Sequence, residues 1–399
     1  MRRTSVRPAA TGVTEPVSAA PARRVMISCG EPSGDLYAGA LVRALQQQAP
    51  GATAFGFGGS HLADAGAELI GDYHGFSVTG LTEALSVVRR SWKMLGTLSD
   101  AARDRRPDVF VAIDFPDFNF RLLPRVHKLG IPIVYYISPQ LWAWRAGRVK
   151  TLKKYVSKML VIFPFEKAIY ERVGLPVEFV GHPLIDLAVA TRSREETCRA
   201  AGLDPARPIV ALLPGSRPNE VRLLLSVLVE AAMRVTRDVP GVQFLVARAP
   251  ALEDVFFEPL EQLRAAGVPL AMIAEATDDV LTASDVVITA SGTATVQTAL
   301  HQRPMVIVYR VSPVTYAIGK RVVRVANYGM VNLVAGRQVV REFIQDGCTP
   351  EAVADEARTL LVDAARADQM RLDLAEVVQK LGGSGASDRA AAAILAACR

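Results

Sequence analysis

The amino-acid sequence predicts an α/β protein with two doubly wound parallel sheets and a cleft between them. From Arg24 onward, short runs rich in β-branched residues alternate with segments of helical spacing, which is typical of βαβ units around a buried parallel sheet. The run at 181–193 breaks this rhythm and separates two series of similar size. A chain of 399 residues is also long for one core and suits two domains.

Each series supplies its own strands. They are expected at 24–30, 53–59, 108–115, 131–137, 158–163 and 177–181 in the first series, and at 208–216, 242–250, 271–276, 285–292 and 304–310 in the second. After the linker, Ser193 and Glu196 form a capping box that begins a new helix. We therefore assign the first domain to 24–185, the second to 186–350 and C-terminal helices to 351–399.

The composition indicates a globular protein with an anionic partner. Half of the residues are hydrophobic, and no apolar run reaches the roughly 18 residues of a membrane span. The net charge of +6 suits phosphates, nucleic acid or an acidic membrane face. The four cysteines form no C-x-x-C pair, which fits a reducing cytosol. Residues 1–23 lack a secretory signal's apolar core and are expected to be a disordered tail, with a transit peptide as the alternative.

Two loops of the second series have the residues of a diphosphate site. Gly215 and Ser216 follow a strand just before Pro218, where a helix would begin, and Arg217 adds a planar donor fork suited to phosphate. The other loop consists of Ser291, Gly292, Thr293, Ala294 and Thr295 and offers hydroxyls and amides without bulk. An ordinary capped helix is the alternative at the first loop, but two such loops in one sheet favour a nucleotide diphosphate. Neither a P-loop nor a dinucleotide fingerprint is present.

The first series also supplies two candidate loops. Asp114 follows an apolar run at a strand's carboxyl end, where desolvation raises the pKa of a carboxylate and favours a general base. A turn or cap hydrogen bond is the alternative. The loop after the first strand contains Gly30, Glu31, Ser33 and Asp35, and either Ser33 or Asp35 can cap the helix that follows. The five histidines show no metal-ligand spacing, so we predict no required metal.

Two stretches combine aromatic and basic side chains. Trp142 and Trp144 follow an apolar run and precede Arg145 and further basic residues, which a packed turn with a solvated helix behind it would explain. In 80–106, the apolar residues Leu81, Leu85, Val88, Trp92, Leu95 and Ala102 recur at helical spacing. This pattern favours a helix packed on a core over a membrane-surface helix. No readout motif accompanies the basic residues, so nucleic-acid binding is not favoured.

The motifs resemble one known family. The segments "GEPSGD", "PDVFVAIDFPDFN", "SPQLWAWRAGRVK", "LLPGSRPNEV", "ASGTATVQTAL" and "NLVAGRQVVREFIQ" occur in this order. The chain is similar to the lipid-A-disaccharide synthase family of GT-B glycosyltransferases from about residue 25 to 360. The resemblance implies a GT-B fold with two Rossmann-like domains and an interdomain cleft. It also implies transfer of 2,3-diacylglucosamine from UDP to 2,3-diacylglucosamine 1-phosphate, with inversion, in lipid A biosynthesis.

The resemblance also assigns residues. Asp114 matches the family's base, and Arg217 would stabilise the departing diphosphate. The nucleotide-sugar site would comprise Gly215, Ser216, Arg217, Glu220, Ser291, Gly292, Thr293, Ala294, Thr295, Gln297, Asn332 and Arg337. Gly30, Glu31, Ser33, Asp35, Trp142, Trp144 and Arg145 would face the glycolipid acceptor or the membrane interface. The expected enzyme needs no cofactor, is cytoplasmic and is peripheral on the inner face of the inner membrane, and a homodimer is left open.

Two residues depart from the family's pattern. Pro32 replaces the usual alanine of "GEASGD" and would stiffen the turn. Gln297 stands where relatives usually carry a glutamate that holds the ribose hydroxyls, so weaker donor binding is expected. Three alternatives stay open: a UDP-sugar 2-epimerase, an undecaprenyl-linked N-acetylglucosamine transferase, or a nucleotide-sugar binder that has lost activity.

Overall fold

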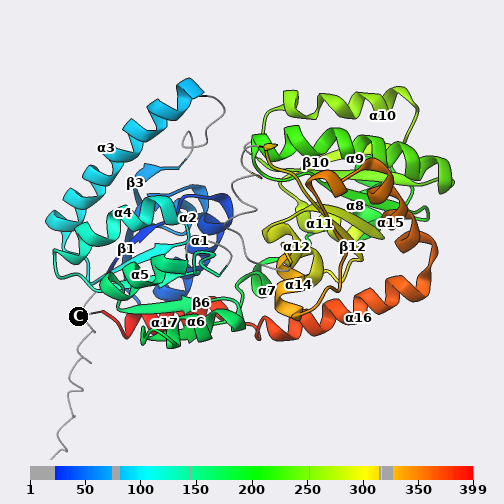
Figure 1. Cartoon of the computed structure of the whole chain (residues 1–399). Helices are drawn as coiled ribbons and strands as arrows, with labels where there is room; N and C mark the ends of the chain where they lie inside the picture. The colour runs from blue at the N-terminus through cyan, green and yellow to red at the C-terminus, as the bar shows by residue number, and fades with distance from the viewer. Residues whose placement is uncertain are drawn as a thin grey trace, which may run out of the picture.

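The computed structural model describes residues 23–73, 81–142, 146–250, 252–313, 316 and 327–398, with the backbone alone at 81–87 and 146. Over these residues the chain forms two α/β domains side by side, each built on one parallel sheet (Figure 1). The predicted fold class is confirmed. The expected N-terminal tail falls almost entirely, and Trp144 and Arg145 fall wholly, outside the described residues.

The first domain is built on a parallel sheet with the strand order β3-β2-β1-β4-β5-β6-β7. Its strands are β1 (Arg24–Ser28), β2 (Thr53–Gly58), β3 (Glu68–Asp72), β4 (Val109–Ile113), β5 (Ile133–Tyr136), β6 (Lys158–Val161) and β7 (Val177–Phe179). Its helices are α1 (Pro32–Gln48), α2 (Ser60–Asp64), α3 (Leu81–Arg105), α4 (Pro116–His127), α5 (Val149–Tyr155) and α6 (Lys167–Glu171), with short 3-10 turns η1 (Ala146–Arg148) and η2 (Pro164–Glu166). Side chains alternate across the strands, so α1 packs on one face while α3 and α4 pack on the other.

Helix α3 differs from its predicted packing. Leu95 and Ala102 in its C-terminal half are fully buried, as expected. Val88 and Trp92, on the same predicted stripe, are instead 49% and 52% exposed, because the N-terminal half extends past the body of the domain (Figure 1). Only part of the helix therefore packs on the core. No helix among the described residues has the length and apolar character needed to cross a membrane.

The second domain is built on a parallel sheet with the order β10-β9-β8-β11-β12-β13. Its strands are β8 (Ile209–Leu213), β9 (Gln243–Arg248), β10 (Leu270–Ala274), β11 (Val286–Ala290), β12 (Met305–Tyr309) and β13 (Glu342–Ile344). Its helices are α8 (Arg194–Ala201), α9 (Pro218–Asp238), α10 (Glu261–Ala265), α11 (Thr277–Ala283), α12 (Thr293–Leu300), α14 (Met330–Ala335) and α15 (Pro350–Val362), with the 3-10 segments η3 (Asp254–Leu260) and η4 (Gln345–Gly347). The predicted capping box at the start of α8 is confirmed, since Ser193 Oγ accepts from the Glu196 amide and Glu196 Oε2 accepts from the Ser193 amide.

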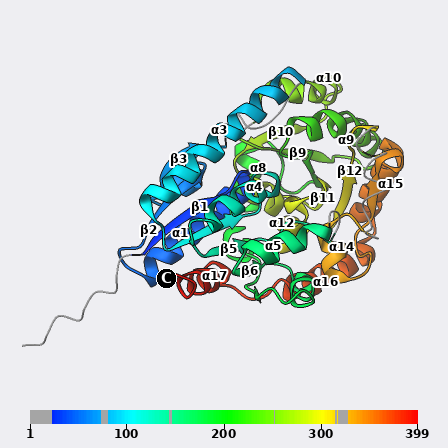
Figure 2. The same ribbon diagram turned by 60° about the vertical axis from the view of Figure 1, so that its left-hand side comes forward.

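The chain passes between the domains twice. The first passage contains α7 (Leu184–Leu187), and the second follows α16 (Ala364–Lys380), which runs under the second domain toward the first. Helix α17 (Ala386–Leu395) then packs on α1 of the first domain (Figures 1 and 2).

The two passages are joined to each other. The His182 amide donates to the Leu381 carbonyl at 2.9 Å, and the Gly385 amide donates to Asp186 Oδ2 at 2.8 Å. A Cβ on Gly382, where φ is +93°, would lie 3.1 Å from the Cα of Gly181. The two connections thus form one compact bridge that fixes how the domains face each other.

Candidate active site between the two domains

The topology places four predicted loops at the middle of the two sheets. Strand β1 lies between β2 and β4, and strand β8 lies between β9 and β11, so each sheet reverses its strand order there. Ligands of doubly wound folds bind beyond the carboxyl ends of the strands at this reversal. The loops after β1 and β4 supply Glu31 and Asp114, and those after β8 and β11 supply Arg217 and the 291–295 loop. All four loops therefore lie at the positions where a ligand site shared by the two sheets would form.

Asp114 lies in a strained turn directly after β4. Asp114 and Phe115 both adopt left-handed backbone angles, with φ of 42° and 48°. Such conformations cost about 1–3 kcal/mol each in non-glycine residues and persist only where the surroundings enforce them. The fully buried side chains of Asn119 and Tyr135 supply that restraint, because Asn119 Nδ2 and the Tyr135 hydroxyl donate to the Asp114 carbonyl at 2.8 and 2.7 Å.

The environment of Asp114 suits a general base. Burial, followed by the charge of Glu31, raises the pKa of Asp114 to about 7, while Arg217 and the Phe115 amide partly oppose the rise. A base with a pKa near the working pH combines a large ionised fraction with useful proton affinity. The side chain thus takes up and releases a proton near neutrality.

Arg217 joins the two domains at this point. Its Nη2 donates to Glu31 Oε2 at 2.7 Å, and its Nη1 donates to Glu220 Oε1 at 2.9 Å. Glu31 ends the loop after β1, 186 residues earlier in the chain. A guanidinium of the second domain is therefore held beside the proposed base of the first.

The loop after β8 does not offer its backbone amides to a phosphate in the way that was predicted. Helix α9 begins at Pro218 as predicted, but the Ser216 and Arg217 amides donate to Glu220 Oε2 at 3.2 and 3.4 Å. Gly215 permits this closure, since φ is +118° and a Cβ there would lie 2.6 Å from Glu220 Oε2. The carboxylate of Glu220 occupies the place predicted for a phosphate, so Arg217 is the group left to meet one.

The loop after β11 keeps part of its amides available. The Ser291 and Thr295 amides donate to the Val308 and Gly292 carbonyls at 3.0 and 3.1 Å, whereas no described residue accepts from the amides at 292–294. Thr295 Oγ1 donates to the Gly292 carbonyl, and Ser291 Oγ donates to the Tyr328 carbonyl at 3.0 Å. Nothing lies within 4 Å of the place a Cβ on Gly292 would occupy, so the space before the helix is open. Of the two predicted loops, this one presents the better anion site.

Asn332 and Arg337 have other partners. Asn332 is fully buried: its Nδ2 donates to the Val340 carbonyl and to Glu342, and its Oδ1 accepts the Val339 and Val340 amides. With its donors and acceptors engaged, it stabilises the fold beneath the 291–295 loop. Arg337 forms ion pairs with Asp373 and Glu376 of α16. We therefore leave both residues out of the proposed nucleotide site.

Asp35 is also a structural residue. Its carboxylate is fully buried and accepts the Gly59, His61 and Leu62 amides at 2.8–3.1 Å. It holds the start of α2, whereas neither it nor Ser33 caps α1. The expected cap was wrong because the carboxylate finds donors 24–27 residues away. Gly30 is needed where predicted, since a Cβ there would lie 2.3 Å from the ring of Phe115.

Trp142 packs into the first domain. Its ring meets that of Phe165 edge to face at 5.5 Å between centroids, and it lies against the core. Its indole nitrogen is buried without a well-formed hydrogen bond, close to Glu166. Burial raises the pKa of Glu166 to about 8, although the Phe163 amide and the Trp142 and Ser138 side chains oppose the rise. Trp142 therefore fits the predicted packed turn better than a contact with the membrane.

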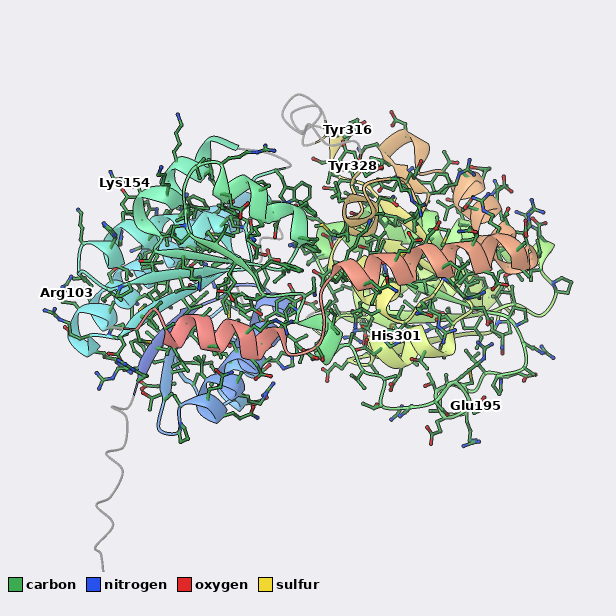
Figure 3. The ribbon with its side chains drawn as sticks, turned by 90° about the horizontal axis from the view of Figure 1, so that it is seen from below. Arg103, Lys154, Glu195, His301, Tyr316 and Tyr328 are labelled. Carbon is green, nitrogen blue, oxygen red and sulfur yellow. The ribbon has the colours of Figure 1, made fainter. Side chains whose placement is uncertain are left out.

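Several supporting residues were not predicted. Tyr135 restrains Asp114 from the neighbouring strand, while Tyr309 and Tyr328 stack at 6.0 Å beside the 291–295 loop. Figure 3 shows Tyr328 next to Tyr316, on the part of the second domain nearest the first. Among the described residues, no group of three or more His, Cys, Asp or Glu is arranged to hold a metal ion.

Replacing Tyr135 with phenylalanine tests the restraint on Asp114. Loss of one neutral hydrogen bond should lower kcat by about 2–10-fold with little change in KM, because the turn relaxes while substrate contacts remain. The acid limb of the pH profile should keep its pKa. Tyr155→Phe, on the partly buried end of α5, is the matched control and should leave kcat unchanged. A fall in both variants would contradict the specific role of Tyr135.

The comparison with known proteins decides the family. A model described as lipid-A-disaccharide synthetase matches residues 25–397. The chain belongs to the lipid-A-disaccharide synthase family. Proteins named lipid-A-disaccharide synthase from Geobacter metallireducens and Myxococcus xanthus are 42% and 41% identical to it over 376 and 372 residues. These matches cover 94% and 93% of this chain and 97% of each relative.

Solved structures agree on the fold of this family member. A UDP-GlcNAc 2-epimerase from Neisseria meningitidis bound to UDP-GlcNAc has a TM-score of 0.68, with 94% of this chain and 99% of that one covered. The calicheamicin glycosyltransferase CalG4 has a TM-score of 0.58, with 95% and 98% covered. At 11% and 16% identity these likenesses show the GT-B fold alone and do not favour an epimerase. The family match makes the chain a glycosyltransferase of lipid A biosynthesis.

Proposed function

We propose that this member of the lipid-A-disaccharide synthase family joins UDP-2,3-diacylglucosamine to 2,3-diacylglucosamine 1-phosphate. The acceptor 6-hydroxyl gives its proton to the Asp114 carboxylate, and its oxygen forms a bond to the donor C1. The bond from C1 to the diphosphate breaks on the opposite face, and UDP leaves with the electron pair. The products are a β-1,6-linked disaccharide 1-phosphate and UDP.

One observation carries this assignment of roles. Asp114 has a pKa of about 7, and the positive charge of Arg217, a residue of the other domain, acts to lower it. A base beside a cation that can neutralise a leaving diphosphate is what an inverting transfer needs. The 291–295 loop supplies further amides for the diphosphate. We propose that the transfer uses neither a metal nor an organic cofactor.

The direct test is UDP release from UDP-2,3-diacylglucosamine in detergent micelles, with and without the 1-phosphate acceptor, in the presence of EDTA. We expect release that depends on the acceptor. UDP binding without any release would indicate a binder that has lost activity. Acceptor-independent turnover would contradict the transfer, and loss of release on adding EDTA would contradict the absence of a metal requirement.

The first domain also has a surface suited to an anionic membrane. Trp92 on α3 is half exposed, and the guanidinium groups of Arg121 and Arg125 on α4 lie 5.6 and 5.8 Å from the centre of its ring. Val88 is exposed one turn earlier on the same helix. Amphipathic rings flanked by arginines suit the boundary between headgroups and acyl chains. We place the enzyme, through this surface, on the cytoplasmic face of the inner membrane.

Replacing both arginines beside Trp92 tests this attachment. Each basic residue near an anionic surface contributes about 1 kcal/mol, so Arg121→Gln with Arg125→Gln should weaken binding to phosphatidylglycerol vesicles by about 10–30-fold. Sedimentation with vesicles gives the affinity, and phosphatidylcholine vesicles give the uncharged reference. Arg237→Gln, at an exposed position in the second domain, is the control. Equal binding by all variants would place the attachment elsewhere.

A further inference from the structure

A groove lies between α9 and the 3-10 segment η3 of the second domain. Its lining side chains are mostly apolar, with one cation and one carboxylate among them: Val221, Arg222, Val255, Phe256, Glu258 and Pro259. The groove has a volume of about 230 Å³, below the roughly 300–1,000 Å³ of pockets that enclose drug-sized ligands. It therefore accommodates a segment of a slender chain rather than a whole nucleotide.

The groove combines apolar surface with two charged groups. Val221 is fully buried and Val255 is 53% exposed. The guanidinium of Arg222 lies 4.9 Å from the centre of the Phe256 ring, so the aliphatic part of Arg222 also borders the groove. Among the described residues, none accepts a hydrogen bond from the Arg222 side chain or donates one to the Glu258 carboxylate. Such a surface suits an apolar chain that begins at a polar linkage.

The groove begins about one helical turn from Arg217. Helix α9 starts at Pro218, so Val221 and Arg222 are four and five residues after Arg217. Four residues advance about 6 Å along an α-helix. The segment η3 packs on α9 and follows β9, so it starts at the carboxyl edge of the sheet, as the loop after β8 does. A diphosphate held by Arg217 would therefore bring the sugar bonded to it close to the groove.

The groove is at the same end of the molecule as the exposed half of α3. Helix α10, which directly follows η3, lies at that end in both views, and so does the projecting N-terminal half of α3 (Figures 1 and 2). The exposed side chains of Val88 and Trp92 belong to that half of α3. An acyl chain that leaves the polar site in this direction therefore meets apolar side chains on both domains.

We infer that this groove binds the first part of one acyl chain of the donor glycolipid. The inference rests on the proposed use of UDP-2,3-diacylglucosamine. In that donor the diphosphate is bonded to C1 of the sugar, and the acyl groups are attached at the adjacent C2 and at C3. The chain from one of these positions lies along Val255 and Phe256, while Arg222 donates to the carbonyl oxygen of its linkage. The groove thereby selects donors by the presence and length of that chain.

The test measures kcat/KM for two series of UDP-linked donors, one with the C2 acyl chain and one with the C3 acyl chain lengthened stepwise. The donors are kept below their micellar concentrations, without detergent. Burying one methylene changes binding by about fourfold, so kcat/KM of the parent should rise by up to that factor per methylene until the groove is full. Val255→Asp places a carboxylate in the groove and keeps water there. In one of the two series it should reduce the gain to about twofold or less per methylene.

Val362→Asp, at a 63% exposed valine of α15 in the same domain, is the matched control and should keep the parent's response in both series. Lengthening the acceptor's chains should affect the parent and Val255→Asp equally, and UDP affinity by calorimetry should be the same in both. A parent that ignores donor chain length, a parent-like response in Val255→Asp, or an equal loss in the control would overturn the inference. A parent that releases UDP from no donor would overturn the proposed function itself.

Discussion

Replacing Asp114 with asparagine should lower kcat by about 10²–10⁴-fold while UDP binding stays nearly unchanged. The substitution keeps the size of the side chain and removes its ability to take the proton of the acceptor hydroxyl. The restraints on this turn involve the carbonyl of Asp114, so they do not depend on the carboxylate. The loss should therefore appear in chemistry rather than in folding, with kcat measured by UDP release and affinity by calorimetry.

The pH dependence of kcat/KM tests the same role of Asp114. Transfer needs the ionised carboxylate, and the pKa of Asp114 is raised to about 7. For the parent, kcat/KM should fall as the pH drops through about 7 and level off above it. The asparagine variant should lack this limb. Asp117→Asn changes a 68% exposed carboxylate three residues away and should retain both rate and profile. Equal activity of the parent and Asp114→Asn would assign the base elsewhere.

Local sequence patterns predicted most of the fold because buried parallel strands are continuous apolar runs. Strands such as β4 and β8 are fully buried along their length and were found in this way. The missed strands β3 and β13 lie at sheet edges, where every residue is partly or largely exposed. Short, mixed sequences such as "ELIGD" and "EFI" each hold two adjacent apolar residues, too few for a strand pattern, so pairing with a neighbour defines them.

The positions of the site loops were predictable, but the partners of their side chains were not. A polar residue after a buried strand, such as Asp114, must lie at the carboxyl edge of the sheet. The pairing of Arg217 with Glu31 joins residues that are 186 positions apart and depends on how the two domains meet. The roles of Asp35 and Asn332 depend on amides brought in by folding, so a motif alone could not separate them from ligand-binding residues.

Arg217→Ala should lower kcat by about 10²–10³-fold, since removing one preorganised group that stabilises developing charge has effects of this size. The Glu220 carboxylate already occupies the neighbouring amides, so no other group at the start of α9 replaces the lost cation. Arg217→Lys keeps the charge but loses the planar fork. It should fall between the parent and the alanine variant. Single-turnover UDP release separates this chemical effect from product dissociation.

Substitution of Arg217 should also change the pKa of Asp114. Its positive charge lowers that pKa, and the charge of Glu31 raises it. Arg217→Ala should therefore move the acid limb of kcat/KM to higher pH, whereas Glu31→Gln should move it to lower pH. Glu68→Gln, an exposed carboxylate paired with Arg105, is the control and should leave the limb in place. Opposite shifts of the acid limb in the two variants would require that the two domains meet at Asp114 in the working enzyme. Shifts of the same sign would mean that Arg217 and Glu31 lie apart from the base during turnover.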